Sequence, residues 1–88
     1  SIRVDGSTAI TDLDVYPNPS RGEINIVSEH AVKMITIYNT LGEVVSIYEY
    51  DEYLPLYIID IHNEPKGIYT LKIKLKNQNT ILTKIVLQ

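Results

Sequence analysis

The chain holds few side chains of the kinds that catalyse reactions. Its two histidines are His30, in a predicted turn, and His62, at a predicted strand end, and neither lies in a motif that places a nucleophile beside a base. The 88 residues include no cysteine, so thiolate nucleophiles, thiolate metal sites and disulfides are excluded. We therefore predict that the chain is not an enzyme.

The acidic residues form two groups, Asp12 with Asp14, and Glu49 with Asp51 and Glu52. Calcium takes about six to eight oxygen ligands, and neither group has the spacing of a defined calcium loop. Carboxylates at sheet edges and turns serve solubility and discourage unwanted edge pairing. The sequence therefore predicts neither a metal site nor a cofactor.

Charge and hydropathy exclude two further classes of partner. The net charge is −3, from 11 acidic and 8 basic residues, which provides no field to attract nucleic acid. The row Lys72, Lys74 and Lys76 is interpreted as the solvent face of a strand, with contact to an anionic glycan as the alternative. No apolar run reaches the roughly 20 residues of a transmembrane helix, so we predict no transmembrane segment.

Short β-branched runs follow one another with a period of two residues. In the run from Ile68 to Lys76, apolar side chains alternate with Thr70 and lysines, so one face meets a core and the other meets water. The predicted strands are Leu13 to Tyr16, Glu23 to Ser28, Lys33 to Tyr38, Glu43 to Tyr50, Leu56 to His62, Ile68 to Lys76 and Thr80 to Leu87. Residues 1–12 are polar and are predicted to be a linker or lead-in. Residues 13–88 are predicted to form one domain.

Turn residues between the runs favour antiparallel pairing. Asn39 to Gly42 is a hairpin loop in which Gly42 takes the left-handed conformation, and Asn77 to Asn79 is a second tight hairpin. The last run, Thr80 to Leu87, clusters its apolar residues, which predicts a strand buried on both faces or shielded by a partner. No segment shows helical periodicity, so the fold class is all-β.

A glycine and a tyrosine introduce the sixth predicted strand. In immunoglobulin-like sandwiches a tyrosine near the start of the F strand sends its hydroxyl back to the upstream backbone. In Pro65 to Leu71, Gly67 precedes the strand and Tyr69 fits this tyrosine corner. We therefore predict an Ig-like antiparallel β-sandwich of about seven strands, the alternative being a plain glycine turn before an amphipathic strand.

Four sequence blocks together resemble a known family. The first is Val15-Tyr16-Pro17-Asn18-Pro19-Ser20-Arg21-Gly22-Glu23-Ile24-Asn25-Ile26, in which two prolines and an asparagine fix a turn that Gly22 relieves. It resembles the opening of the type IX (Por) secretion system C-terminal sorting domain of Bacteroidetes. The blocks Ile35 to Val45, Ile59 to Tyr69 and Thr83 to Gln88 resemble later parts of the same family, in the same order.

The resemblance implies a non-catalytic secretion signal. Its implied partners are an N-terminal cargo domain, the outer-membrane translocation machinery and a sortase-like cysteine protease that cleaves within residues 1–12. The implied destination, reached through the periplasm, is the cell surface or the extracellular space. The motif and candidate recognition residues are Tyr16, Pro17, Asn18, Pro19, Gly22, Gly42, Gly67, Tyr69, Lys84, Ile85, Val86, Leu87 and Gln88.

Two other functions stay open on the sequence alone. The chain has seven tyrosines and neither tryptophan nor phenylalanine, and exposed tyrosines can stack on sugars. An Ig-like carbohydrate-binding or adhesion module is therefore the main alternative. A structural spacer is the other.

Overall fold

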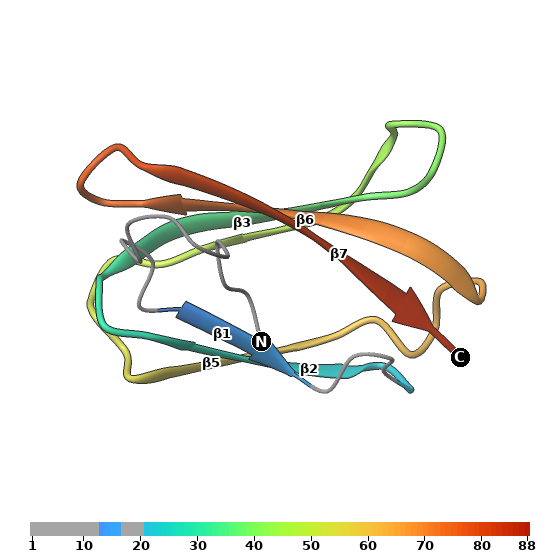
Figure 1. Cartoon of the computed structure of the whole chain (residues 1–88), viewed down its shortest axis with the longest axis horizontal. Coiled ribbons are helices and arrows are strands. Elements are labelled where there is room, and N and C mark those ends of the chain that lie inside the picture. The colour runs from blue at the N-terminus through green and yellow to red at the C-terminus, as the bar shows by residue number, and fades with distance from the viewer. Residues whose placement is uncertain (1–12, 17–20) are drawn as a thin grey trace, which may run out of the picture.

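The computed structural model describes residues 13–16 and 21–88, and all seven predicted strands are present in it (Figure 1). They are β1 (Leu13–Tyr16), β2 (Glu23–Ser28), β3 (Val32–Tyr38), β4 (Val44–Glu49), β5 (Leu56–Asp60), β6 (Gly67–Leu75) and β7 (Thr80–Leu87). Strand ends differ from prediction by one or two residues, because terminal residues such as Glu43 and His62 take part in turns. The described residues contain no helix, and so none that could span a membrane.

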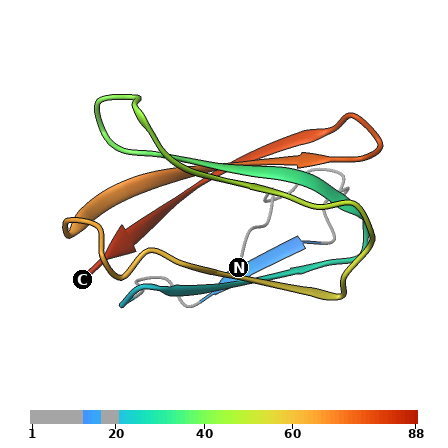
Figure 2. The ribbon, with the colours of Figure 1, turned by 180° about the vertical axis from the view of Figure 1, so that it is seen from behind.

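The strands form two antiparallel sheets that face each other (Figures 1 and 2). Sheet A has the order β1-β2-β5, and sheet B has the order β4-β3-β6-β7. This is the arrangement of an Ig-like sandwich, in which β6 takes the place of the F strand. The predicted fold class is confirmed.

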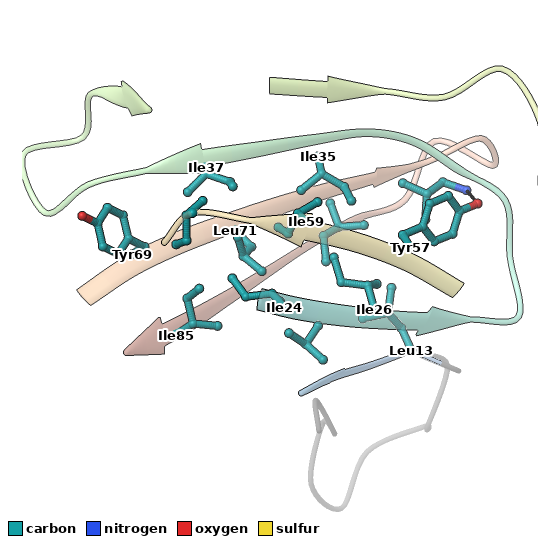
Figure 3. Packing of buried hydrophobic residues seen from close by; sticks show 14 of the residues in the cluster. Leu13, Ile24, Ile26, Ile35, Ile37, Tyr57, Ile59, Tyr69, Leu71 and Ile85 are labelled. Atoms are coloured by element: carbon teal, nitrogen blue, oxygen red, sulfur yellow. Dashed lines mark hydrogen bonds between the residues drawn. The ribbon is translucent and has the colours of Figure 1, made fainter. Parts of the chain in front are cut away.

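Alternation along each strand assigns one face of each sheet to the core. Ile24 and Ile26 of β2 face Ile35 and Ile37 of β3 across the sandwich, and all four are fully buried (Figure 3). Burial of each such side chain stabilises the fold by about 1.5–3 kcal/mol before entropy is counted. The core is almost entirely aliphatic, which suits a chain with no disulfides.

Tyr57 joins the two sheets through its hydroxyl. The side chain lies on β5 of sheet A and is 1% exposed. Its oxygen accepts a hydrogen bond from the backbone N–H of Val32, at the start of β3 in sheet B, and another from Leu54, each at 3.1 Å. The Tyr50 and Tyr57 rings also pack edge to face, with their centroids 4.7 Å apart. Tyr57 therefore satisfies two backbone donors while filling one end of the core.

Both predicted hairpins are present. Gly42 closes the β3–β4 turn with φ +82°, and the Gly42 N–H donates to the Asn39 carbonyl at 3.0 Å. In the β6–β7 turn, Gln78 has φ +79°, although it is not a glycine. Side chains with a Cβ are strained in this region of backbone space. The second turn is therefore formed at some cost in stability.

The expectation that the last strand is buried on both faces is wrong. Ile85 and Leu87 of β7 point into the core, but Leu82 is 64% exposed and Val86 is 41% exposed. The strand alternates like its neighbour β6, because it closes one side of a sandwich whose outer face has no further layer among the described residues. The alternative, shielding by a partner, stays a prediction.

Candidate functional site at the motif end of the sandwich

Gly22 lies where the chain enters β2, against the segment that follows β5. Its φ is +136°, and a Cβ placed on it would lie 2.4 Å from the Cβ of His62. The Gly22 carbonyl accepts a hydrogen bond from the Ile61 N–H at 2.9 Å. A side chain here would separate these two segments. The sequence indicated that a glycine relieves the turn, but the contact with His62 depends on long-range packing that the sequence does not show.

Tyr69 forms the predicted tyrosine corner. The ring is buried on the inner face of β6, and its hydroxyl donates to the carbonyl of Pro65, four residues upstream. Burial raises the pKa of this phenol above its usual value of 10.0, and the nearby Glu64 carboxylate adds to the shift. Gly67, with φ +151°, gives the chain the bend it needs between these two residues.

The last residues of β7 lie beside this corner. In the β6–β7 pairing, Gly67 is opposite Leu87, Tyr69 is opposite Ile85, and Ile68 is opposite Val86. Ile85 and Leu87 therefore belong to the core, whereas Lys84, Val86 and Gln88 have exposed side chains. The predicted recognition strand thus divides into packing positions and surface positions.

The β3–β4 turn is held by a compact set of hydrogen bonds. The Asn39 side-chain oxygen accepts from the N–H groups of Leu41 and Glu43, at 2.9 and 3.0 Å, and its amide donates to the Glu43 carboxylate at 2.9 Å. Asparagine at this position mimics a backbone turn. The result is an ordered hairpin tip, Asn39–Gly42, which extends beyond the sandwich (Figures 1 and 2).

These features gather at one end of the molecule. Figure 1 shows the hairpin tip, the turn before β6, the entry to β2 and the end of β7 together at its right-hand side, and Figure 2 shows the same grouping from behind. We call this the motif end, comprising Gly22, Asn39–Gly42, Glu64–Tyr69 and Ile85–Gln88. A groove of about 340 Å³ separates the hairpin tip from the turn before β6.

Five predicted site residues are not in this group, one of which is Lys84, the residue of β7 directly before Ile85. Tyr16 ends β1 on the outer face of sheet A, is 46% exposed, and its carbonyl accepts a 3.4 Å hydrogen bond from the Asn25 side chain. Pro17, Asn18 and Pro19 lie outside the described residues, as does the predicted linker 1–12.

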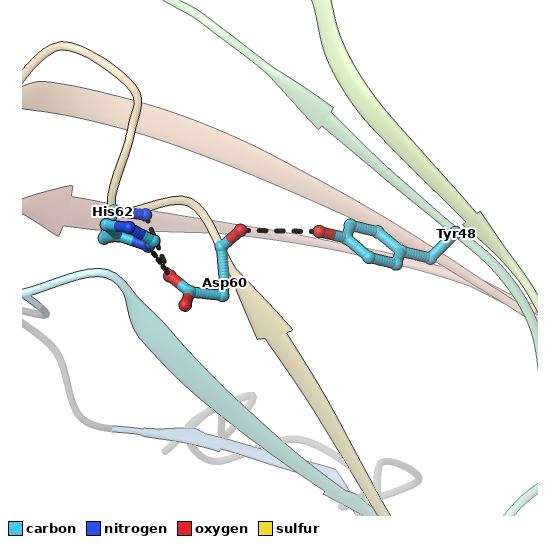
Figure 4. A network of polar contacts seen from close by, with 3 residues as sticks. All are labelled: Tyr48, Asp60 and His62. Carbon is cyan, nitrogen blue, oxygen red and sulfur yellow. Dashed lines mark hydrogen bonds and ion pairs between the residues drawn. The ribbon is translucent and has the colours of Figure 1, made fainter.

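Asp60 and His62 form the one histidine–carboxylate pair among the described residues. The Asp60 carboxylate accepts from the His62 backbone N–H at 2.9 Å and lies 2.8 Å from its Nδ1 (Figure 4). The backbone hydrogen bond, and then the ring, lower the pKa of Asp60. Tyr48 donates to the Asp60 backbone carbonyl at 3.5 Å, not to either side chain.

This pair is a turn element without the partners that catalysis needs. Both side chains are more than half exposed, and no hydrogen bond in the described part of the chain joins a serine or threonine hydroxyl to the imidazole. A nucleophile within hydrogen-bond reach of the base is the first requirement of such chemistry. Residues 13–16 and 21–88 also contain no group of three or more metal-ligating side chains.

A known protein family matches almost all of this sandwich. The family described as the secretion system C-terminal sorting domain matches residues 14–88. The chain belongs to this family. A comparison with curated proteins found no match.

Membership assigns the sorting domain to type IX secretion, whose sorting signals accompany export to the cell surface or the extracellular space. Domains of this family are in general non-catalytic. The match begins one residue after Leu13, the first described strand residue, so it covers all of the described sandwich except Leu13. The sorting signal is therefore associated with the folded sandwich, not with one short motif.

Two structural roles were not predicted from the sequence, one at the motif end and one at the opposite end of the core (Figure 3). One is the role of His62, which lies so close to position 22 that only a glycine fits there. The other is the role of Tyr57, which is buried at the interface between the sheets. Its signal was the alternation Tyr57, Ile59, Ile61, which places these three side chains on one face.

Proposed function

We propose that this sorting domain directs an N-terminal cargo protein through the type IX outer-membrane translocon to the cell surface. The family match over residues 14–88 carries the proposal. The exposed, ordered motif end supports it, because a signal read after folding needs a rigid surface. Nothing in the proposal requires catalysis by the domain itself.

Removal of the domain is the second part of the proposal. A sortase-like cysteine protease would cleave within residues 1–12, ahead of the sandwich, and the cargo would then be attached to the surface. Proteases cut exposed, extended segments more readily than strands paired in a sheet. The polar composition of residues 1–12 fits such a segment.

The exposed side chains of the terminal strand are proposed to take part in recognition by the translocon. Deleting Thr83 to Gln88 would not test this, since it removes Ile85 and Leu87 from the core. Replacing Val86 by serine and removing Gln88 alters the surface alone. We expect delivery to fall while the unfolding temperature is kept. Equal delivery would show that the translocon does not recognise Val86 or Gln88.

Sufficiency of the domain is tested by fusion to a periplasm-directed fluorescent protein in a host with type IX secretion. We expect the fusion to residues 1–88 to reach the surface and the reporter alone to stay in the periplasm. Mass spectrometry of the delivered reporter is expected to show a new C-terminus within residues 1–12. Periplasmic retention of the fusion would contradict the proposed function, whereas delivery without cleavage would contradict only the processing step.

A further inference from the structure

A second groove lies on the outer face of sheet B, beside the hairpin tip. It has a volume of about 550 Å³, and the residues that line it include Tyr38, Asn39, Ile68, Lys72, Leu82 and Lys84. Clefts of about 300–1,000 Å³ are typical of binding sites. One wall is the β3–β4 hairpin, ordered by Asn39, and the floor is the outer face of β6 and β7.

Two aliphatic side chains on the floor of this groove are exposed. Leu82 is 64% exposed and Ile68 is 48% exposed, and the pair Thr70 and Lys84 lies between them. Lys72 stands directly opposite Leu82, so the stem of the lysine and the leucine lie side by side across two strands. Leu82 and the lysine stem together therefore offer an apolar contact directly beside a positive charge.

The charge on the groove has one sign. Lys72 and Lys84 line it, Lys74 follows on the same face of β6, and no carboxylate is among the described residues that line it. The chain as a whole is acidic, with a net charge of −3. The local field therefore favours an anionic occupant against the sign of the rest of the molecule.

The mixture of cations and aliphatic side chains narrows the class of occupant. A saccharide would be expected to stack on exposed aromatic rings, but Tyr38, the one aromatic side chain among the described residues that line this groove, is half-buried. A protein segment that carries a carboxylate beside an aliphatic residue matches both the lysines and Leu82. The buried aliphatic contact would supply affinity, and the charges would supply specificity.

We propose that this groove is the docking site for an acidic and aliphatic protein segment of the export machinery. The inference rests on the proposed sorting function and names the partner chemistry of one surface. Leu82 is the apolar anchor, Lys72 pairs with the acidic group, and the hairpin tip fixes the width of the groove.

The test is a competition inside a type IX host. A reporter fused to residues 1–88 is produced together with a free copy of the domain in the periplasm, and surface fluorescence is measured as the free copy is increased. We expect the wild-type free domain to inhibit delivery. The substitutions Leu82→Asp and Lys72→Glu should each raise the amount needed for half-inhibition by at least about tenfold, as expected for loss of an interface anchor.

Matched controls make the same chemical changes elsewhere. Ile58→Asp alters a residue 53% exposed on the outer face of sheet A, and Lys33→Glu alters an exposed lysine at the far end of β3 from the hairpin. Both should compete like wild type. All four positions lie outside the core cluster, and thermal unfolding of each purified variant verifies that the fold is kept.

Each outcome is decisive. If Leu82→Asp and Lys72→Glu compete as well as wild type, the proposed docking site is wrong. It is also wrong if delivery depends on the translocon but no free domain inhibits it. The proposed sorting function stands in both cases. Failure of the reporter fusion itself to be delivered overturns both proposals.

Two other occupants would be recognised by further measurements on the purified domain. In one case, Lys72→Glu no longer competes and is no longer retained on dextran sulfate, whereas Leu82→Asp still does both. The occupant is then a polyanion, and the protein-segment proposal is wrong. If sedimentation velocity shows that the wild-type domain self-associates and Leu82→Asp is monomeric, a second copy covers the groove and the proposal is again wrong.

Discussion

At the residue scale, Gly22 is the position where a single methyl group should matter most. An alanine there would combine an unfavourable φ of +136° with a 2.4 Å approach to the His62 Cβ. We expect Gly22→Ala to destabilise the domain by about 2–4 kcal/mol in urea unfolding. Gly42→Ala is the comparison, because nothing lies within 4 Å of its Cβ position, and strain alone should cost about 1–2 kcal/mol. Equal costs at the two positions would show that the His62 contact is unimportant.

Tyr69 supports a second prediction, which includes a pH dependence. Tyr69→Phe removes the hydrogen bond to the Pro65 carbonyl and should cost about 1 kcal/mol at neutral pH. The folded pKa of this phenol is raised above 10.0, so the stability it contributes is present below pH 10.0 and is lost as the pH rises through the folded pKa.

The measurement is the free energy of unfolding between pH 8 and pH 11 for both proteins. Burial also raises the pKa of Tyr50, so the Tyr69→Phe variant should still lose part of its stability at alkaline pH. We therefore expect a smaller decline for Tyr69→Phe than for wild type. An identical decline in the two proteins would exclude Tyr69 as a source of the alkaline instability.

At the scale of single elements, the bridge from β5 to β3 depends on one hydroxyl. Tyr57→Phe leaves the N–H groups of Val32 and Leu54 without the acceptor they have now, and we expect a loss of about 2 kcal/mol. Tyr53→Phe is the matched control, because that ring is 49% exposed and its hydroxyl donates to a single carbonyl, that of Ser28. A cost for Tyr57→Phe no greater than for Tyr53→Phe would contradict the bridging role.

The β6–β7 hairpin offers a stabilising change. Gln78 holds φ +79°, which glycine adopts without strain. Gln78→Gly should raise the free energy of unfolding by about 0.5–1 kcal/mol, whereas Gln78→Ala, which keeps the Cβ, should bring no gain. Thermal melts of the three proteins decide the matter. A destabilised glycine variant would mean that the turn relies on the glutamine side chain.

Strands β6 and β7 show how much of a strand's position and burial the sequence can predict. Strict alternation in Tyr69, Leu71 and Ile73 fixed both the strand and its inner face, and the glycine before it located the tyrosine corner. The run Ile85-Val86-Leu87 is apolar at every position, so its sequence does not distinguish an exposed face from a buried one and predicts burial of both. Only pairing with β6, where Val86 stands opposite Ile68, decides which face meets water.

At the scale of the whole molecule, the sequence predicted the fold better than the site. Period-two patterns are local, and so the number of strands and the sandwich class could be read from them. The motif end joins Gly22, the Asn39–Gly42 tip and the end of β7, which are far apart in the chain. Their proximity follows from the strand order β4-β3-β6-β7 opposite β1-β2-β5, which no local pattern encodes.

The central claim is that this domain addresses its cargo to the type IX translocon. The most direct test measures surface fluorescence of a reporter fused to residues 1–88 in two otherwise identical hosts, one with the translocon and one without it. The account predicts surface delivery in the first host and periplasmic accumulation in the second. Equal surface delivery in both hosts would contradict it.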